Sequence, residues 1–179
     1  MGIRLDRQGN LVCQNRTHVI TSSSHAQFSS LRNWLHVHQE SLKRLLYSTN
    51  CILFGEWMQS KHSIYYDSLQ DYFCAFDLYD LEEKKFWSTS RFTSVVVPLG
   101  FCVAPLLEVP ATLTRDTIIE LIHQPSAFST QSLREGVVLR RDSQDWMVDK
   151  AKVVRSDFIA PGTTQHWSSS TVVSNVIQS

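Results

Sequence analysis

Residues 53–80 of this 179-residue chain read LFGEWMQSKHSIYYDSLQDYFCAFDLYD. The stretch starts inside an apolar run, residues 51–54, that stops at a Gly-Glu pair ending in Glu56. A second, aromatic-rich run stops at a Phe-Asp pair ending in Asp77. Short apolar runs rich in β-branched and aromatic residues are typical of buried strands. A carboxylate at the end of each is unusual, because Asp and Glu are rarely buried without a partner. Either the charges mark where core strands leave the interior, or they belong to a binding site.

The composition is that of one soluble globular domain. The length is sufficient for an independent hydrophobic core, and 42% hydrophobic with 19% charged residues is unlike a disordered chain. Lysine plus arginine and aspartate plus glutamate each number 17, so the formal net charge is zero. Binding to a nucleic acid would therefore depend on a local basic patch and not on the field of the whole protein.

Cysteine usage and the absence of targeting signals predict an intracellular protein, in the cytoplasm or nucleus. The four cysteines form no Cys-x-x-Cys pair and lie mostly in apolar runs, as expected for reduced, buried thiols. No apolar segment is long enough to span a bilayer, and the first residues lack the apolar core of a signal peptide. We therefore expect a protein that is not secreted and has no membrane partner.

Local patterns predict an α+β fold. Residues 3–6 and 11–14 flank a Gly-containing turn and predict a β-hairpin. Ser24 and Gln27 form a candidate capping box before an amphipathic helix whose apolar positions continue to Leu46. We also expect a short helix over 91–99 that ends at Gly100, followed by a strand over 101–105. Thr114 is expected to cap a helix over 115–123, and residues 133–140 and 146–154 are expected to form a second hairpin.

No linker or internal repeat divides the chain. We assign residues 1–167 to one domain and residues 168–179 to a C-terminal tail. The tail is rich in Ser and Thr and is expected to be loose, apart from Val172, Val173 and Val176, which can form a final helix or strand.

The second predicted hairpin carries a charged constellation. Lys150 and Lys152 are two residues apart and project from one face of their strand, while Glu135 lies at the start of the facing strand beside Gly136. Gly136 allows a ligand or another backbone to approach closely. Lysines so placed can neutralise phosphate oxygens, and a carboxylate can hold Mg²⁺. The alternative is a solvated cross-strand ion pair that contributes less than about 1 kcal/mol.

The order of these units resembles that of the ATP-dependent RNA ligase domain in the covalent nucleotidyltransferase superfamily. An arginine, Arg16, follows the first hairpin, the Gly-Glu and Phe-Asp pairs come next, and Glu-Gly-Val-Val and Lys-x-Lys complete the series. The resemblance extends from Met1 to about Trp167. It implies an α+β nucleotidyltransferase domain, ATP-grasp-like and shared with DNA ligases, with mostly antiparallel sheets and flanking helices.

The resemblance also implies roles for residues along the first half of the chain. Arg16 resembles the arginine that contacts the nucleotide and the RNA end. Glu56 resembles the acid that contacts the ribose of the adenylate. Phe76 resembles the aromatic residue that stacks on adenine, a contact that a flat π-face can make. Asp77, which points the other way on its strand, is expected to support the site from behind.

Three residues of the second hairpin complete the implied site. Glu135 resembles the acid linked to the divalent metal, and Lys150 and Lys152 resemble the pair that grips the α-phosphate. The implied catalytic residues are therefore Glu135, Lys150 and Lys152, with ATP and Mg²⁺ as cofactors. ATP or AMP and RNA ends with 5′-phosphate and 3′-hydroxyl groups are the implied partners of a monomer acting in RNA repair.

Ligases of this family attack ATP with the lysine of a Lys-x-Asp/His-Gly motif, and no such motif occurs in residues 1–179. In the family it lies just upstream of the first hairpin, which begins here at Met1, so we expect an N-terminally truncated domain. Lys43, on the amphipathic helix, and Lys61, in a different family segment, are poor substitutes, because a lysine nucleophile must be activated and aimed at phosphorus.

Three interpretations follow from the missing motif. The chain can be a fragment or truncated form of an active ligase. It can be a nucleotide- or RNA-end-binding module that has lost self-adenylylation but still acts on a pre-adenylylated end. It can be a non-catalytic protein whose fold serves interaction. The sequence therefore leaves open whether the chain is an enzyme by itself.

Overall fold

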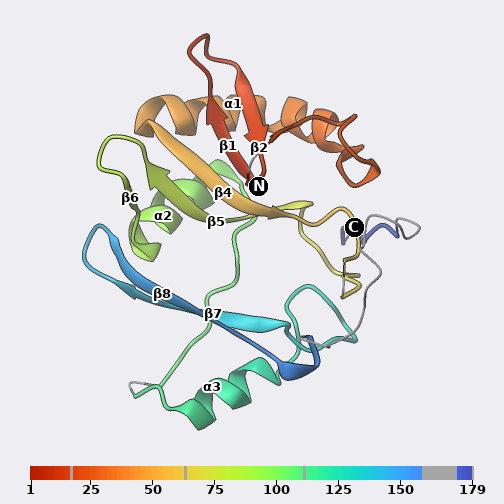
Figure 1. Ribbon diagram of the computed structural model, residues 1–179, viewed down its shortest axis with the longest axis vertical. Coiled ribbons are helices and arrows are strands. Elements are labelled where there is room, and N and C mark those ends of the chain that lie inside the picture. The colour runs from red at the N-terminus through yellow and green to blue at the C-terminus, as the bar shows by residue number, and fades with distance from the viewer. Residues whose placement is uncertain (17, 63, 111, 159–172, 179) are drawn as a thin grey trace.

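The computed structural model describes residues 1–16, 18–62, 64–110, 112–158 and 173–178. A six-stranded antiparallel sheet with strand order β3-β2-β1-β4-β5-β6 forms the larger part of the molecule (Figure 1). Its strands are β1 (Gly2–Leu5), β2 (Leu11–Gln14), β3 (Val19–Ile20), β4 (Cys51–Trp57), β5 (Phe73–Asp80) and β6 (Lys85–Phe86). The predicted α+β class with antiparallel sheets is confirmed.

The first predicted hairpin is confirmed as β1 and β2, and its turn is built from local polar contacts. The Asp6 carboxylate accepts hydrogen bonds from the backbone N–H groups of Gln8, at 2.9 Å, and Asn10, at 2.8 Å. Gly9 has a φ of 80°, a left-handed conformation that glycine adopts without strain. Turn and strands are thus encoded within about a dozen consecutive residues.

Helix α1 (Leu31–Thr49) packs its apolar stripe against β1 and β4. Leu42 and Leu45 on this stripe have no exposed surface. The helix begins later than predicted, and Ser24 does not cap it: the Ser24 hydroxyl accepts from the backbone N–H of Thr21 at 2.9 Å, while a separate 3₁₀ turn, Ala26–Phe28, precedes the helix. Serine satisfies a nearby backbone donor in a turn as readily as at a helix end, so the capping pattern was ambiguous.

Strands β4 and β5 do not end at the two carboxylates, which corrects the prediction from residues 53–80. Glu56 is followed by Trp57 within β4, and Asp77 lies in the middle of β5. The register shifts between Phe54 and Gly55, because Phe54 pairs with Asp77 and Gly55 pairs with Ala75. The residue of β5 without a cross-strand partner is therefore position 76, and a bulge of this kind redirects side chains.

The bulge keeps the inner face of β5 apolar on both sides of the break. Phe73 and Ala75 before it, and Leu78 after it, are all fully buried on the α1 side. Phe76, at the bulge, is 37% exposed. Gly55 is required opposite, because a Cβ atom there would lie 2.4 Å from the ring of Phe73.

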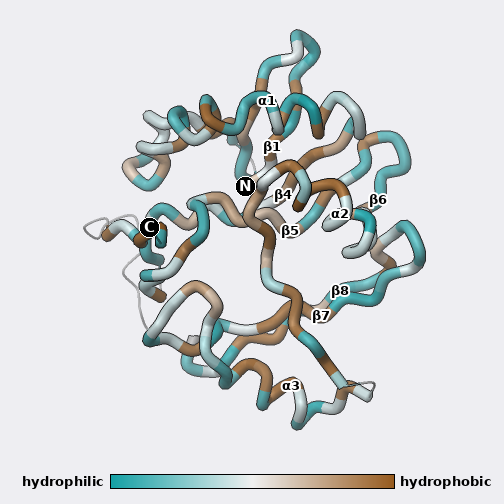
Figure 2. Tube along the Cα trace, turned by 180° about the vertical axis from the view of Figure 1, so that it is seen from behind, coloured by the Kyte–Doolittle hydropathy of each residue, from teal (hydrophilic) through white to brown (hydrophobic). Residues whose placement is uncertain are grey.

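A helical segment and a connecting strand follow the sheet. Helix α2 (Thr89–Val96) and a 3₁₀ turn (Val97–Leu99) end at Gly100, whose φ is 82°, as predicted. The prediction of a strand over 101–105 is wrong, because this segment forms only one isolated bridge, between Val103 and Ala75. This segment leaves the sheet after the bridge, and Figure 2 shows it as the mostly hydrophobic tube that runs from α2 toward α3.

The second predicted hairpin is confirmed as β7 (Gly136–Asp142) and β8 (Met147–Val154), a separate two-stranded antiparallel sheet. Helix α3 (Arg115–Ile122) contacts β7, and Thr114 caps it through the N–H of Thr117, as predicted. In Figure 1 the hairpin and α3 lie on one side of the six-stranded sheet, and α1 lies on the other. A 3₁₀ turn, Ser156–Phe158, follows β8.

Part of the predicted tail can be located. Residues 173–178 lie beside the loop that follows β4, through isolated bridges that join Ser174 to Ser60 and Ile177 to Leu69. The predicted domain boundary at 167 and Val172 fall within 159–172, outside the described residues.

Candidate functional site

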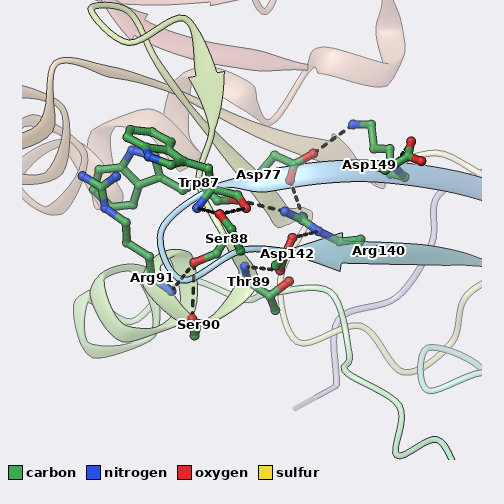
Figure 3. A network of polar contacts seen from close by, with 12 residues as sticks. Asp77, Trp87, Ser88, Thr89, Ser90, Arg91, Arg140, Asp142 and Asp149 are labelled. Carbon is green, nitrogen blue, oxygen red and sulfur yellow. Dashed lines mark hydrogen bonds and ion pairs between the residues drawn. The ribbon is translucent and has the colours of Figure 1, made fainter. Parts of the chain in front are cut away.

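A buried carboxylate joins the six-stranded sheet to the β7–β8 hairpin. Asp77 is 3% exposed and forms ion pairs with Arg140 of β7 and, at 3.3 Å, with Lys150 of β8. The Arg140 guanidinium also donates to the backbone carbonyls of Trp87, at 2.9 Å, and Phe76, at 3.4 Å. Figure 3 shows this arginine reaching from the hairpin to the sheet. Because a buried carboxylate is costly without its cations, the contact fixes the hairpin against β5.

The expectation that Asp77 supports the site from behind is wrong, because Asp77 lies on the same face as Glu56 and pairs with Lys150. Sequence reasoning also missed Arg140. The two cations occupy facing positions, since Arg140 pairs with Lys150 across the hairpin. Side chains at facing positions share one face of a sheet. Two cations at facing positions of the predicted hairpin indicate that another element supplies an acidic partner. This pattern could have been used to predict an ion pair at Arg140. The identity of the acidic partner depends on tertiary contacts.

The tip of the hairpin is fastened to the start of α2. The Asp142 carboxylate accepts from the N–H of Thr89 at 2.7 Å (Figure 3). The Arg91 guanidinium lies over the rings of Trp87 and Trp146, 3.8 Å and 4.7 Å from their centroids. These contacts and the Asp77 ion pairs hold the hairpin at two points along its length.

The predicted lysine pair is on one face of β8, but each lysine has its own carboxylate. Lys150 is paired with Asp77, and its ammonium also lies 4.6 Å from the ring centroid of Phe86. Lys152 pairs with Glu135 at 3.4 Å, and both of these side chains are exposed, at 62% and 43%. We expected Glu135 to lie next to both lysines. The structure instead pairs Glu135 with Lys152 and pairs Lys150 with Asp77.

Gly136 is needed for pairing within the hairpin. A Cβ atom at this position would lie 2.1 Å from the backbone oxygen of Val153. The neighbouring Glu135 carbonyl accepts from the N–H of Arg155 at 3.0 Å, which continues the ladder by one residue. The sequence indicated that a ligand or another backbone comes close to Gly136, and in the structure the partner strand β8 does so. This pairing fixes the backbone position of Glu135.

Two of the predicted nucleotide contacts face the hairpin. Along β4 the residues Cys51, Leu53, Gly55 and Trp57 are buried, so Glu56, which is exposed, projects from the opposite face. Asp77 is on this same face, as the partner of Phe54, and the exposed Phe76 precedes it on the bulge. The structure thus brings Glu56 and Phe76 to the side of the sheet on which Lys150 reaches Asp77.

Arg16 lies at the same end of the sheet, one strand pair away. It is exposed and follows Gln14, which is aligned across the sheet with Gly2, Phe54 and Asp77 in a single row. The backbone position is compatible with a contact to a ligand on this face, which is what the sequence predicted for Arg16.

Tyr66 is a further residue of this region that sequence reasoning did not single out. Its ring packs edge-on against Phe128, with centroids 5.9 Å apart. Burial, reinforced by the negative charges of Glu135 and Glu56, raises the pKa of Tyr66 to about 12. The Tyr66 ring also packs against the apolar cluster that includes Cys74, which pairs with Glu56 across β4 and β5.

Two cavities of the described structure lie away from these residues. One of about 500 Å³ is lined by residues that include His38, Asp71 and Cys102, and His38 pairs with Asp71 at 3.3 Å. Another of about 520 Å³ lies between α1 and strands β2 and β3. Neither is lined by the predicted nucleotide contacts. Glu56, Phe76 and Lys150 thus bring charged and aromatic side chains to the face between sheet and hairpin, outside both cavities.

The family model for RNA ligase matches residues 1–154, which include Arg16, Glu56, Phe76, Glu135 and the lysine pair. No curated protein and no solved structure gives a significant match. Among the described residues, no helix is long and apolar enough to cross a membrane. The match covers most of the sequence, and the chain belongs to the RNA ligase family.

Proposed function

We propose that this chain is a nucleotidyltransferase-type RNA ligase domain that binds ATP or AMP with Mg²⁺ and acts on RNA ends with 5′-phosphate and 3′-hydroxyl groups. The observation that carries the proposal is the shared face of Glu56, Phe76 and Lys150. Three strands supply there a carboxylate, an exposed aromatic ring and an ammonium group. A ribose, a base and a phosphate require these three kinds of contact.

The residue roles follow from chemistry and position. The exposed ring of Phe76 stacks on adenine, and the Glu56 carboxylate accepts hydrogen bonds from the ribose hydroxyls. Lys150 and Lys152 neutralise the phosphate next to the adenosine. Each lysine already has a carboxylate within 3.4 Å, so a bound phosphate shares or replaces that partner. Arg16 contacts the nucleotide and the RNA end.

Glu135 is the residue that would hold the divalent metal. Within the described part of the chain, no group of three or more His, Cys, Asp or Glu side chains could form a complete metal site. Mg²⁺ usually has only one or two carboxylate ligands and completes its shell with water and substrate phosphates, so a single Glu135 suits it. The ion would neutralise the phosphate charge that develops during transfer. Lys152, at 3.4 Å from Glu135, would hold this carboxylate beside the phosphate.

The reaction proposed for these residues is the sealing step. The 3′-hydroxyl oxygen attacks the 5′-phosphorus of an adenylylated RNA end and forms a phosphodiester bond. The bond from that phosphorus to the bridging oxygen breaks, AMP leaves with that oxygen, and the hydroxyl proton passes to solvent. Positioning and charge neutralisation are the main contributions to such a step. It requires no lysine nucleophile, and residues 1–179 contain no Lys-x-Asp-Gly or Lys-x-His-Gly sequence.

The test uses the polypeptide of residues 1–179 with Mg²⁺. We expect it to join 5′-adenylylated RNA to a 3′-hydroxyl acceptor and to form no covalent adduct with labelled ATP. Replacing Lys150 or Lys152 with Gln should weaken AMP binding by about tenfold or more, since a charge-assisted hydrogen bond contributes about 1.5–3 kcal/mol. Lys84→Gln, in the exposed β5–β6 turn, is the matched control and should bind AMP like the wild type. A labelled protein-AMP band would show that some residue of this chain is a nucleophile.

A second candidate function is a non-catalytic module that binds nucleotide or RNA ends. The observation that favours it is that Lys150 and Lys152 are both ion-paired within the protein. Binding of AMP without any joined RNA would support this module. If AMP, ATP and adenylylated RNA all fail to raise the melting temperature, both functions are refuted and a pure interaction role is favoured.

A further inference from the structure

Residues 173–178 form a strap across the loop that connects β4 to β5. The strap is held by backbone hydrogen bonds at both ends: the Lys61 N–H donates to the Val173 carbonyl at 2.8 Å, and the Gln178 N–H donates to the Leu69 carbonyl at 2.8 Å. Figure 1 shows the C-terminal end of the chain beside this loop. The strap is thus integrated into the fold around the site.

Asn175 is the buried side chain of the strap. It is 3% exposed, whereas its described neighbours along the strap are exposed. Its Nδ2 donates to the carbonyl of Met58 at 2.8 Å, and its Oδ1 accepts from the N–H of Tyr66 at 2.9 Å. Its backbone N–H donates to the carbonyl of Gln59, also at 2.8 Å. One amide therefore ties the start of the loop, just after β4, to Tyr66 in its middle.

Tyr66 has its whole backbone committed to the strap. Besides the bond from its N–H to Asn175, its carbonyl accepts from the N–H of Val176 at 2.9 Å. The position of the Tyr66 ring therefore depends on the strap. That ring packs against an apolar cluster that includes Cys74, and Cys74 is the cross-strand partner of Glu56, the acid proposed to contact the ribose. The raised pKa of the phenol, caused by burial and by the charges of Glu135 and Glu56, agrees with this placement.

We propose that Asn175 is a positioning residue of the nucleotide site, which holds the Tyr66 hydroxyl near Glu56 as a hydrogen-bond donor to the bound nucleotide. This rests on the proposed function, because the donor has a role only if the face binds a nucleotide. A hydroxyl donor near a carboxylate suits a nucleotide, because the phosphate or hydroxyl oxygens of the ligand accept from the phenol while the carboxylate accepts from the ribose hydroxyls. The strap thereby supplies part of the site through a residue more than a hundred positions away.

The first test measures the strap without any nucleotide. Amide hydrogen exchange is followed in the full chain for Asn175→Ala and for Asn33→Ala, an exposed asparagine of α1 that serves as the matched control. We expect exchange at the amide of Tyr66 to become at least tenfold faster in Asn175→Ala, with the β4 and β5 ladder unchanged. The ¹⁹F resonance of fluorotyrosine at position 66, assigned by its loss in Tyr66→Phe, should also shift. Unchanged exchange and resonance would overturn the positioning role.

The second test measures AMP binding. Asn175→Ala and Tyr66→Phe should each weaken it by about tenfold, and the double variant should be no weaker than the weaker single variant, because both changes remove the same donor. Gln178→Ala, at the exposed end of the strap, should bind like the wild type. Full AMP affinity in Asn175→Ala despite a displaced Tyr66 would overturn the proposal. If the wild type does not bind AMP, the proposed function fails, and the role of Tyr66 at the site fails with it. The exchange test still decides whether Asn175 holds the loop.

Discussion

Replacing Arg140 with alanine should destabilise the protein strongly, because the change leaves the Asp77 carboxylate buried with a single cation. The Asp77 side chain is 4% exposed and that of Arg140 is 17% exposed. Removing one partner of a buried ion pair costs about 3–5 kcal/mol. Lys150 remains 3.3 Å from Asp77. Since that lysine still compensates part of the charge, we expect a loss near the lower limit, about 3 kcal/mol.

The next residue of the same strand provides the control. Arg141 pairs with Asp149 at 3.9 Å, and both side chains are more than 70% exposed. An exposed ion pair contributes about 0–1 kcal/mol, so Arg141→Ala should leave the free energy of unfolding almost unchanged. The two substitutions remove the same side chain from adjacent positions and differ mainly in burial.

The assay is urea unfolding at pH 7, followed by both tryptophan fluorescence and circular dichroism. Coincident curves are required for a two-state free energy, because the hairpin could separate from the sheet before the rest unfolds. A loss below about 1 kcal/mol in Arg140→Ala, equal to that in Arg141→Ala, would refute the argument that Asp77 depends on Arg140.

Three further predictions concern local geometry and ionisation. Gly136→Ala should cost about 1–3 kcal/mol in urea unfolding, because its Cβ would meet the Val153 oxygen at 2.1 Å; wild-type stability would contradict the close pairing. Burial opposes ionisation of Asp80, but hydrogen bonds from two following amides and the Trp87 indole lower its pKa. The ionised Asp80 therefore stabilises the folded protein above the unfolded pKa of about 3.9, and this stabilisation is lost as pH falls through the lower folded pKa. The difference in free energy of unfolding between the wild type and Asp80→Asn should become smaller as the pH is lowered. A difference that stays constant down to pH 2 would contradict this. Burial raises the pKa of the Cys13 thiol to about 12, so little reactive thiolate forms at pH 8. Mass spectrometry should find Cys13 unmodified by iodoacetamide in the folded protein and alkylated after denaturation. Rapid alkylation of the folded protein would contradict the burial.

Elements with local signals were predicted well. Both hairpins and the helix after Thr114 are encoded by turn residues, alternation and a cap within a few positions of one another. Where a signal had two local solutions, the prediction failed. Ser24 could satisfy a helix end or a turn, and it satisfies the turn at Thr21. The apolar residues 101–105 resemble a strand, yet a single bridge, between Val103 and Ala75, is all that the described structure shows.

The sequence by itself determined the family, because the order of short motifs is a property of the chain alone, and the match over residues 1–154 confirms it. Tertiary structure decided which charges meet. Asp77 pairs with Arg140, which is 63 positions away in the sequence, and Asn175 accepts a hydrogen bond from Tyr66, which is 109 positions away. The bulge that exposes Phe76 exists because β5 pairs with β4 in a register that neither strand encodes alone. Such contacts depend on the packing of distant segments, and local patterns carry no information on which segments will pack together.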